Sequence, residues 1–411
     1  MVNDSCCAVI LIRSNPLRKL CAVPIIVRLI RALYEAGLRR IILWGEKFIE
    51  EIKSLIHDGE TLGLEVRYEI SSQNCMNYIV ISTDFLVDKE LIKELLKQDV
   101  NTIFFKEING NRLFVAGILQ PDMLNQVLKY LKETIILPKD ENYFEAKMIN
   151  IEGLRVYYRS LRRELELLAL PIISDEDLKN AAKVLIRRTQ KGLHFTSSIN
   201  KYPENAFLRL FCNIRRITPN KVTIISNITA YLVAILFILG KPIYAMIFAF
   251  LTSILDGVDG KLARVRGIGT RLGEIEHSFD MLYEQIIYVA WIYYVYTTMP
   301  LLNVLFIGFL FLVSDTFTRH VYMQFKMSTG KNLLLMSKFD RMMAKIDGRR
   351  NVWFIYMLIG ILTIPFYGLL LMLFHSIATS TIYVVRAIYH LKRMDLAEKT
   401  VEWLKLIYES S

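Results

Sequence analysis

Long apolar stretches in the second half of the sequence limit most strongly how this chain can fold. A helix needs about 20 residues to cross the hydrocarbon core of a bilayer. We place six such stretches, near 220–240, 243–264, 272–297, 301–323, 352–364 with some preceding residues, and 367–390. The pattern predicts an all-α domain with six membrane spans. A five-span alternative treats 353–374 as one crossing, because the run before Pro365 is short.

The composition shows that the chain also has a polar part. Of its 411 residues, 53% are hydrophobic, too many for a wholly soluble protein, yet 22% are charged, too many for a protein embedded throughout in lipid. Formal net charge is +11. With six spans, the basic residues gather in the inner loops and the outer turns hold only Lys241, so the positive-inside rule predicts a cell-membrane protein with cytoplasmic termini. Such charge points to lipid or phosphorylated substrates and away from nucleic acid.

Residues 1–195 have the pattern of a cytoplasmic α/β domain. Up to about residue 150, apolar runs such as CAVILI and NYIVIST alternate with amphipathic stretches such as PIIVRLIRALYEAG, which predicts a mostly parallel sheet with helices. Residues 145–195 are charged and predicted to be helical, with a capped amphipathic helix that ends at Gly192. The predicted fold class is therefore multi-domain, an α/β domain followed by a six-helix membrane domain.

A juxtamembrane helix is predicted over 196–218, between the two domains. Four large apolar residues share one of its faces with arginines around them, a pattern typical of a helix lying on the membrane surface: Phe207, Leu210, Phe211 and Ile214. Thr218 is a good N-cap and Pro219 suits the first helical position, so the first span is expected to begin there. The membrane domain then covers 219–395, and 396–411 form a cytoplasmic tail.

The cysteines give no sign of a disulfide framework. Their number is odd and their spacing is not that of metal ligands. We therefore expect reduced thiols at Cys6, Cys7, Cys21, Cys75 and Cys212.

Four carboxylates at the inner ends of two consecutive spans are the strongest candidates for chemistry. Asp256 and Asp259 are three residues apart, Glu276 and Asp280 are four apart, and each pair shares one side of its helix. Ionised carboxylates in a membrane must be compensated by cations. One possibility is structural pairing with the basic residues Lys261, Arg264 and Arg271. The other is a site for Mg²⁺ or Mn²⁺, which take oxygen ligands and serve phosphate chemistry.

The segment DGVDGKLAR resembles the signature of the CDP-alcohol phosphotransferases, also called CDP-alcohol phosphatidyltransferases. Their pattern is D-x-x-D-G-x-x-A-R, eight residues, then G-x-x-x-D-x-x-x-D. The first half matches at Asp256, Asp259, Gly260, Ala263 and Arg264. The resemblance covers roughly residues 196–390.

The second half of the signature departs from the family pattern by one residue. Gly273 keeps its place, but strict spacing then puts His277 and Met281 at the acidic positions. Removing one intervening residue places Glu276 and Asp280 there. We prefer this register, because methionine can neither bind a hard cation nor accept a proton.

The resemblance implies an enzyme that moves a phosphate-linked group from a CDP-alcohol, of the CDP-lipid or CDP-inositol type, to an alcohol or alcohol phosphate, with release of CMP. It implies that the four acids hold two Mg²⁺ or Mn²⁺ ions, that Asp280 is also the general base, and that the protein is a homodimer. The residues implied in nucleotide binding are Asp256, Asp259, Gly260, Ala263, Arg264 and Gly273.

Arginines in and between the last three spans are candidates for an acceptor phosphate. Arg319 and Arg386 lie on predicted spans and Arg349 lies in the loop between them. Arginine suits phosphate because its planar fork donates two parallel hydrogen bonds. The alternative for Arg319 is a structural pair with Asp315, four residues earlier.

The first domain resembles a sugar-phosphate nucleotidyltransferase over about residues 6–150. The segment PIIVRLIRALYEAGLRRIILWG carries the likeness, and Asp84 follows a strand where a metal-binding aspartate would lie. The phosphate loop differs, because Arg13 to Lys19 include no glycine to let backbone N–H groups approach a triphosphate. In order, the two domains resemble the fused inositol-phosphate cytidylyltransferase and di-myo-inositol-phosphate-phosphate synthase proteins. We expect the cytidylyltransferase-like domain to be degenerate and inactive.

Two other classes of function fit the same residues. The shortened motif and the glutamate at its third acidic position are compatible with a catalytically impaired scaffold or regulator. Membrane carboxylates also line the paths of cation transporters. Those sites usually lie near the midplane between repeats, whereas these acids crowd the inner ends of two helices and the sequence shows no repeat.

Overall fold

The computed structural model divides the chain into two compact units. The residues described are 6–45, 47–56, 63–68, 75–140, 143–158, 161, 163–191, 194–268 and 272–410, without the side chains of 56, 272–277 and 404–410. The α/β unit comprises Met1–Lys191, Arg209–Arg216 and Arg264–Gly267. The helical unit comprises Gly192–Leu208, Ile217–Ala263 and Ile268–Ser411.

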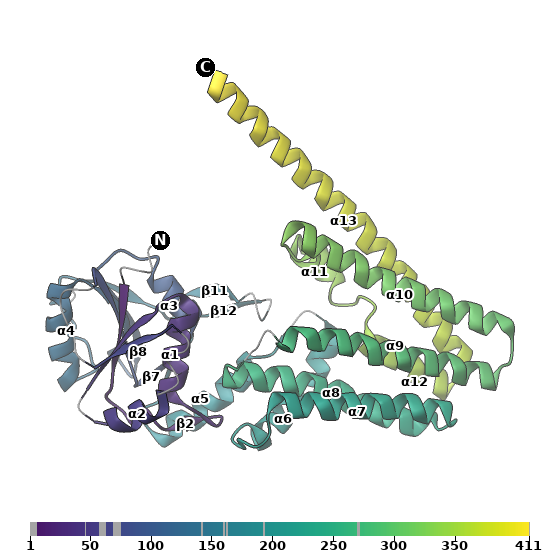
Figure 1. Cartoon of the computed structure of the whole chain (residues 1–411), viewed down its shortest axis with the longest axis horizontal. Helices are drawn as coiled ribbons and strands as arrows, with labels where there is room; N and C mark the ends of the chain where they lie inside the picture. Colours follow the sequence, from purple (N-terminus) through teal and green to yellow (C-terminus); the bar gives the residue numbers. More distant parts are fainter. Residues whose placement is uncertain are drawn as a thin grey trace. The chain divides into compact units, whose positions relative to one another are not determined.

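A mixed sheet forms the centre of the α/β unit (Figure 1). Over the described residues it has seven strands in the order β10-β8-β9-β6-β1-β4-β5. Their bounds are β1 Cys6–Leu11, β4 Arg40–Trp44, β5 Glu65–Arg67, β6 Asn77–Ser82, β8 Thr102–Ile108, β9 Asn111–Leu119 and β10 Lys147–Asn150. Strand β9 runs antiparallel to β6 and β8, and the other pairs are parallel. The central β1 is buried along its length, as an unbroken apolar run in a parallel sheet should be. The predicted mostly parallel sheet is confirmed.

Short strands and five helices complete the α/β unit. The small strands are β2 Lys19–Leu20, β3 Val23–Pro24, β7 Phe85–Val87, β11 Arg155–Tyr158, β12 Arg163–Glu166 and β13 Ala169–Pro171. The helices described in this unit are α1 Ile25–Ala36, α2 Ile49–Ile56, α3 Lys89–Leu95, α4 Pro121–Glu133 and α5 Asp175–Arg188.

The helical prediction for 145–195 is wrong over its first half. The described elements of this half are the strands β10 to β13, and β11 pairs with β12 in antiparallel fashion. The many charged residues of this segment suggested a helix. In β12, the exposed Glu164 and Glu166 instead alternate with the partly buried Arg163 and Leu165. The capped helix itself is confirmed as α5, with Ser174 and Asp177 in a capping box, although it ends at Arg188 before Gly192.

The helical unit contains long helices joined by short turns (Figure 1). They are α6 Phe195–Phe211, α7 Pro219–Ile238, α8 Pro242–Arg266, α9 Leu272–Thr298, α10 Leu302–Thr329, α11 Lys338–Met343, α12 Arg350–Leu362 and α13 Pro365–Ser410, with a 3₁₀ turn at Leu333–Leu335. The predicted start of α7 is confirmed, since Thr218 accepts from the N–H of Lys221 and Pro219 follows it. The juxtamembrane helix is α6, which ends at Phe211, so Ile214 lies beyond it.

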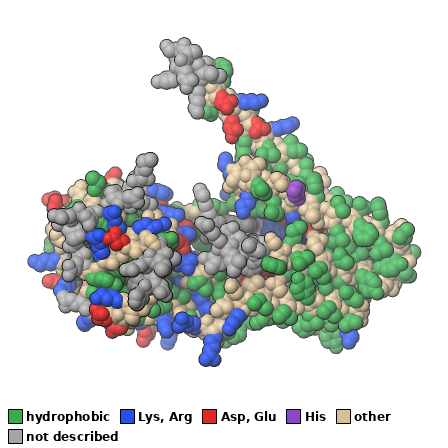
Figure 2. Space-filling model, in the orientation of Figure 1, with side chains coloured by type: hydrophobic (Ala, Val, Ile, Leu, Met, Phe, Trp, Pro, Cys, Tyr) green, Lys and Arg blue, Asp and Glu red, His purple; other side chains and the backbone are tan. Residues whose placement is uncertain are grey.

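Four described helices are long and apolar enough to cross a membrane: α7, α8, α10 and α13, the last over Pro365–Trp403. Helix α12 is apolar but shorter. The six-span count stays a prediction. Figure 2 shows hydrophobic side chains gathered over the visible face of the helical unit. Many large apolar residues of its helices are exposed, Leu302 by 80%. Such a surface suits lipid and not water.

The single crossing over 353–374 is wrong, because the helix breaks before Pro365. Helices α12 and α13 instead pack closely where two glycines meet. A Cβ added to Gly368 would lie 2.5 Å from the carbonyl oxygen of Tyr356 and 3.1 Å from Cα of Gly360. The core beneath them is aromatic, with Trp291, Trp353 and Phe311 fully buried.

Candidate active site in the helical unit

The two aspartates of α8 have different surroundings. Asp256 is 30% exposed at its side chain, and its Oδ2 lies 2.6 Å from Nη2 of Arg350 on α12. Asp259 is buried, and its Oδ2 accepts a hydrogen bond of 2.9 Å from the hydroxyl of Thr223 on α7. Its Oδ1 accepts from the N–H of Gly260. Three helices therefore meet at these two carboxylates.

The third described acid, Asp280, lies on α9. It is half-buried, and its charge acts on the phenol of Tyr283 together with the charge of Asp256. The hydroxyl of Tyr283 also accepts a hydrogen bond from Arg350. The charges of the first and last acids of the predicted set thus both act on Tyr283, and Arg350 contacts Asp256 and Tyr283. The side chains of Glu276 and His277 and the surroundings of Gly273 lie outside the described residues.

Two of the basic residues near the motif have described contacts with α6 and with the α/β unit. Lys261 is buried and pairs with Glu204 of α6, with Nζ 2.8 Å from Oε2. Arg264 donates from Nε to the carbonyl of Thr189 at 3.0 Å. Gly260 and Ala263 are half-buried on α8, and Arg271 lies outside the described residues.

A buried chain of alternating charges leads away from Asp256 across four helices. Arg350 lies 3.4 Å from Glu284 of α9, which lies 2.5 Å from Arg319 of α10. Arg319 lies 3.0 Å from Asp315, confirming the structural pair considered for it. The indole of Trp353 donates to Asp315 at 3.1 Å. Such networks hold helices in register when every member is paired.

The other two arginines suggested for an acceptor phosphate also have carboxylate partners. Arg349 lies 2.5 Å from Asp347, and Arg386 lies 2.5 Å from Asp340. Both aspartates are buried. The structure therefore does not bring Arg319, Arg349 and Arg386 together at one carboxylate or one described pocket.

The carboxylates of α8 and α9 are the residues that could hold a divalent cation. Among the described residues, no three side chains of His, Cys, Asp or Glu form a metal-binding group, and Glu276 is not among the side chains described. The donor chemistry is nevertheless that of Mg²⁺, since Asp256, Asp259 and Asp280 offer carboxylate oxygens at one end of two helices. The residues fit the group by donor type.

The α/β unit has a second polar cluster where β1 and β6 end. Strands β1 and β6 are parallel neighbours, but the chain continues from β1 to β4 on one side of this pair and from β6 to β8 and β9 on the other. Ligands of open α/β sheets bind at such points. Here Nε of Arg13 lies 3.0 Å from Asp84, and the N–H of Arg13 donates to the hydroxyl of Thr83. Arg18, in the same loop, donates to the carbonyls of Ile172 and Ile173. Side chains of the α/β unit itself therefore occupy the place at the ends of β1 and β6 where a ligand would bind.

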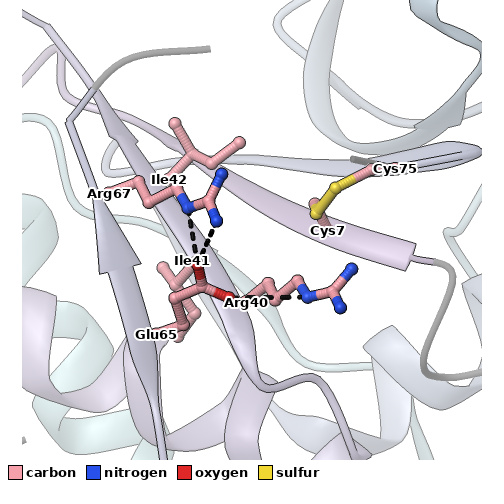
Figure 3. A pocket seen from close by; sticks show the side chains of 7 residues that line it. All are labelled: Cys7, Arg40, Ile41, Ile42, Glu65, Arg67 and Cys75. Atoms are coloured by element: carbon pink, nitrogen blue, oxygen red, sulfur yellow. Dashed lines mark hydrogen bonds and ion pairs between the residues drawn. A yellow bond between two sulfur atoms is a disulfide. The ribbon is translucent and has the colours of Figure 1, made fainter. Parts of the chain in front are cut away.

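A disulfide joins Cys7 and Cys75, and the expectation of reduced thiols is wrong for this pair. Their Cα atoms are 5.8 Å apart because β1 and β6 are neighbours, which residue counting cannot reveal. The small cavity beside them holds about 10 Å³ and is lined by Glu65, which binds Arg40 and Arg67 (Figure 3). That is room for about one water molecule and not for a substrate.

Comparisons with known proteins identify the helical part. A family model described as CDP-alcohol phosphatidyltransferase matches residues 216–389. A curated protein, the bifunctional IPC transferase and DIPP synthase of Thermococcus kodakarensis, is 28% identical over 101 residues. That alignment covers 24% of this chain and 23% of the relative, so the chain spans about a quarter of the length of the curated protein it matches.

Two solved structures are similar to parts of the chain. Phosphatidylinositol phosphate synthase of Mycobacterium tuberculosis with CDP-DAG bound has a TM-score of 0.36 and 18% identity, covering 46% of this chain and 94% of that one. A Bacillus anthracis protein described as a glucose-1-phosphate thymidylyltransferase, in complex with sucrose, has a TM-score of 0.30 and 11% identity, covering 44% and 94%. At these TM-scores neither likeness defines the fold or the function of this chain.

The matched family consists of transferase enzymes, and its stretch contains the acids of both α8 and α9. Residues 216–389, less than half of the chain, match the CDP-alcohol phosphatidyltransferase family model, so the helical part of the chain is similar to the transferases of that family.

Proposed function

We propose that this protein transfers a phosphate-linked group from a membrane-bound or soluble CDP-alcohol to an alcohol or alcohol phosphate and releases CMP. The observation that carries the proposal is the contact of Arg350 with Asp256 and Tyr283, inside the stretch that the family model matches and that also contains Asp280. In this reaction the acceptor oxygen forms a bond to phosphorus, and the bond from that phosphorus to the CMP oxygen breaks. Asp280 takes the proton of the acceptor hydroxyl.

The four acids Asp256, Asp259, Glu276 and Asp280 would hold two Mg²⁺ or Mn²⁺ ions. When bound, these ions neutralise charge on the transferred group and on the departing CMP. Gly260 and Ala263 would leave a shallow surface for cytidine on α8, with Gly273 beside it. Arg264 would contact phosphate. Donor identity, as a CDP-lipid or a CDP-inositol, is left to experiment.

The arginines proposed for an acceptor phosphate lie on α10, α13 and just before α12. Arg319, Arg349 and Arg386 each pair with a carboxylate, so the structural role that the sequence left open for Arg319 is the one its contacts favour. A phosphate would have to share the five N–H donors of such an arginine with that carboxylate.

We also propose that the chain is a homodimer in the cell membrane with both termini in the cytoplasm, and that the α/β unit is an inactive, cytidylyltransferase-like domain. The inner-loop charges support the topology. The ion pair of Arg13 and Asp84 supports the proposed inactivity, because Arg13 binds the carboxylate that a metal ion would need.

The reaction is tested with the full chain in detergent, Mg²⁺, and a panel of CDP-donors and alcohol acceptors, with CMP as the product measured. We expect CMP release that depends on one donor and one acceptor class and falls at least about 100-fold in Asp280→Asn. Asp395→Asn, an exposed aspartate on α13, is the matched control and should keep full activity.

The alternatives predict other results. A folded protein that releases no CMP with any pair of substrates would favour the scaffold or regulator. Cation flux into proteoliposomes that Asp256→Asn abolishes, again without CMP, would favour the transporter.

A further inference from the structure

Helix α6 buries its polar side although it precedes the family-matched stretch. Asn200, Glu204 and Asn205 are each less than 9% exposed, whereas Tyr202 on the opposite side is 73% exposed. This reverses the usual arrangement of an amphipathic helix, in which apolar residues face the protein. A buried polar face needs polar partners.

Helix α8 supplies those partners at three successive turns. Nδ2 of Asn200 donates to the hydroxyl of Ser253 at 2.7 Å. One turn further, Glu204 lies against Gly257. At the next turn the ammonium of Lys261, only 1% exposed, lies 2.8 Å from Glu204 and donates to Asn205 at 2.7 Å.

Gly257 makes room for this contact. A Cβ at this position would lie 2.3 Å from Oε1 of Glu204, so the glutamate side chain would have to shift. The missing side chain lets Glu204 lie against α8 and reach Lys261 one turn further along that helix. Glycine inside a helix lowers stability by about 1 kcal/mol relative to alanine, so its use at position 257 calls for such a packing reason.

The contacts fix the rotation of α8 about its own axis. Ser253, Gly257 and Lys261 are four residues apart and form one row along the helix. At about 100° per residue, the row lies about 130° from the direction shared by Asp256 and Asp259. Helix α6 therefore packs beside the acids without covering them. A slip of one residue would turn Asp256 away from Arg350 and Asp259 away from Thr223.

We propose that α6 is a clamp that sets the rotation of α8, and that Glu204 is a positioning residue for Asp256 and Asp259. By pairing with Lys261, Glu204 also keeps that ammonium away from the carboxylates. This inference rests on the proposed function, in which those two acids bind a divalent cation.

The test uses the full chain in detergent and compares Glu204→Gln, Lys261→Met and the double variant. Each single variant leaves one buried charge without its partner, and the double variant leaves none. We expect each single variant to lose at least about 5 °C in Tm and the double variant to regain most of it. Mn²⁺ binding, followed by electron paramagnetic resonance, should weaken about 10-fold or more in Glu204→Gln and recover in the double variant.

A pair of glycine variants separates positioning from general packing. Gly257→Ala forces a methyl against Glu204. Gly308→Ala forces one against Ile292 in the contact of α10 with α9, where the added Cβ would lie 2.5 Å from Cγ2. Both should lower Tm, but only Gly257→Ala should weaken Mn²⁺ binding.

The clamp is overturned if Glu204→Gln binds Mn²⁺ as the unchanged protein does, or if the two glycine variants weaken binding equally. An unchanged protein that binds no Mn²⁺ overturns it as well. A protein that binds Mn²⁺ and shows the expected pattern but releases no CMP contradicts the proposed reaction while supporting the clamp.

Discussion

Arg350 lies 2.6 Å from Asp256, which gives the first acid of the motif a counterion from a helix 94 residues further along the chain. The same guanidinium lies 3.4 Å from Glu284 and donates to the hydroxyl of Tyr283. It therefore joins α12 to α8 and α9, as the described counterion of Asp256 and as a second one for Glu284 beside Arg319.

Replacing Arg350 by methionine should destabilise the protein strongly. Asp256, 30% exposed, would lose its counterion while Glu284 would keep Arg319, and breaking a buried pair costs at most about 3–5 kcal/mol. Arg350→Lys should recover part of this loss, because it restores the charge without the planar fork. The measurement is thermal unfolding in detergent.

Arg393→Met is the control for that experiment, since Arg393 is exposed on the last part of α13. It should change stability by less than about 0.5 kcal/mol. Equal stability of the Arg350 and Arg393 variants would show that the pair with Asp256 contributes nothing.

The acids could be predicted from the sequence, but their partners could not. Asp256 and Asp259 stand out because carboxylates three residues apart in an apolar run are rare. Arg350 looked like one more loop charge, because a pair across helices depends on packing that no spacing reveals. Glu284 did carry a signal, since it continues the four-residue spacing of Glu276 and Asp280.

The same limit explains the errors elsewhere in the chain. Apolar runs predicted β1 and β6 correctly, because central parallel strands are apolar throughout. They could not show that these strands are neighbours, and so the disulfide between Cys7 and Cys75 was missed. The buried polar face of α6 could not be predicted for the same reason, since a glutamate such as Glu204 is typical of a solvent-exposed position unless a partner such as Lys261 lies beside it.

The contact of α11 with α13 should be sensitive to acid. Asp340 is buried and accepts hydrogen bonds from Arg386, Ser337 and His390. Burial acts to raise the pKa of Asp340, but these hydrogen bonds outweigh it and lower the pKa below its ordinary value. The resulting stabilisation is present above the unfolded-state pKa, about 4, and is lost as the pH falls through the folded-state pKa.

Asp340→Asn isolates that effect. The difference in Tm between the unchanged protein and this variant should be constant from pH 8 to about 5 and should shrink below about pH 4. A difference that persists unchanged at pH 3 would mean that the charge of Asp340 does not stabilise the fold.

Reduction of the disulfide should destabilise the α/β unit. Cys7 and Cys75 are separated by 68 residues, and cross-linking a loop of this size removes chain entropy equivalent to about 4 kcal/mol at 25 °C. Thermal unfolding with and without reductant measures the loss. Cys75→Ser should show the same loss without reductant and no further change with it, whereas Cys212→Ser, which removes a thiol outside the disulfide, should keep the response to reductant.

The pairing of Arg13 with Asp84 predicts that the α/β unit turns over no nucleotide. Asp84 is 5% exposed, so Arg13→Ala would leave a buried carboxylate without its partner and should cost about 3 kcal/mol or more. Arg13→Ala combined with Asp84→Asn removes both charges and should recover much of that stability. Neither protein should release pyrophosphate from CTP with any sugar or polyol phosphate. CTP-dependent pyrophosphate release by the unchanged chain that Asp84→Ala abolishes would instead make this domain an active cytidylyltransferase, with Arg13 as part of its site.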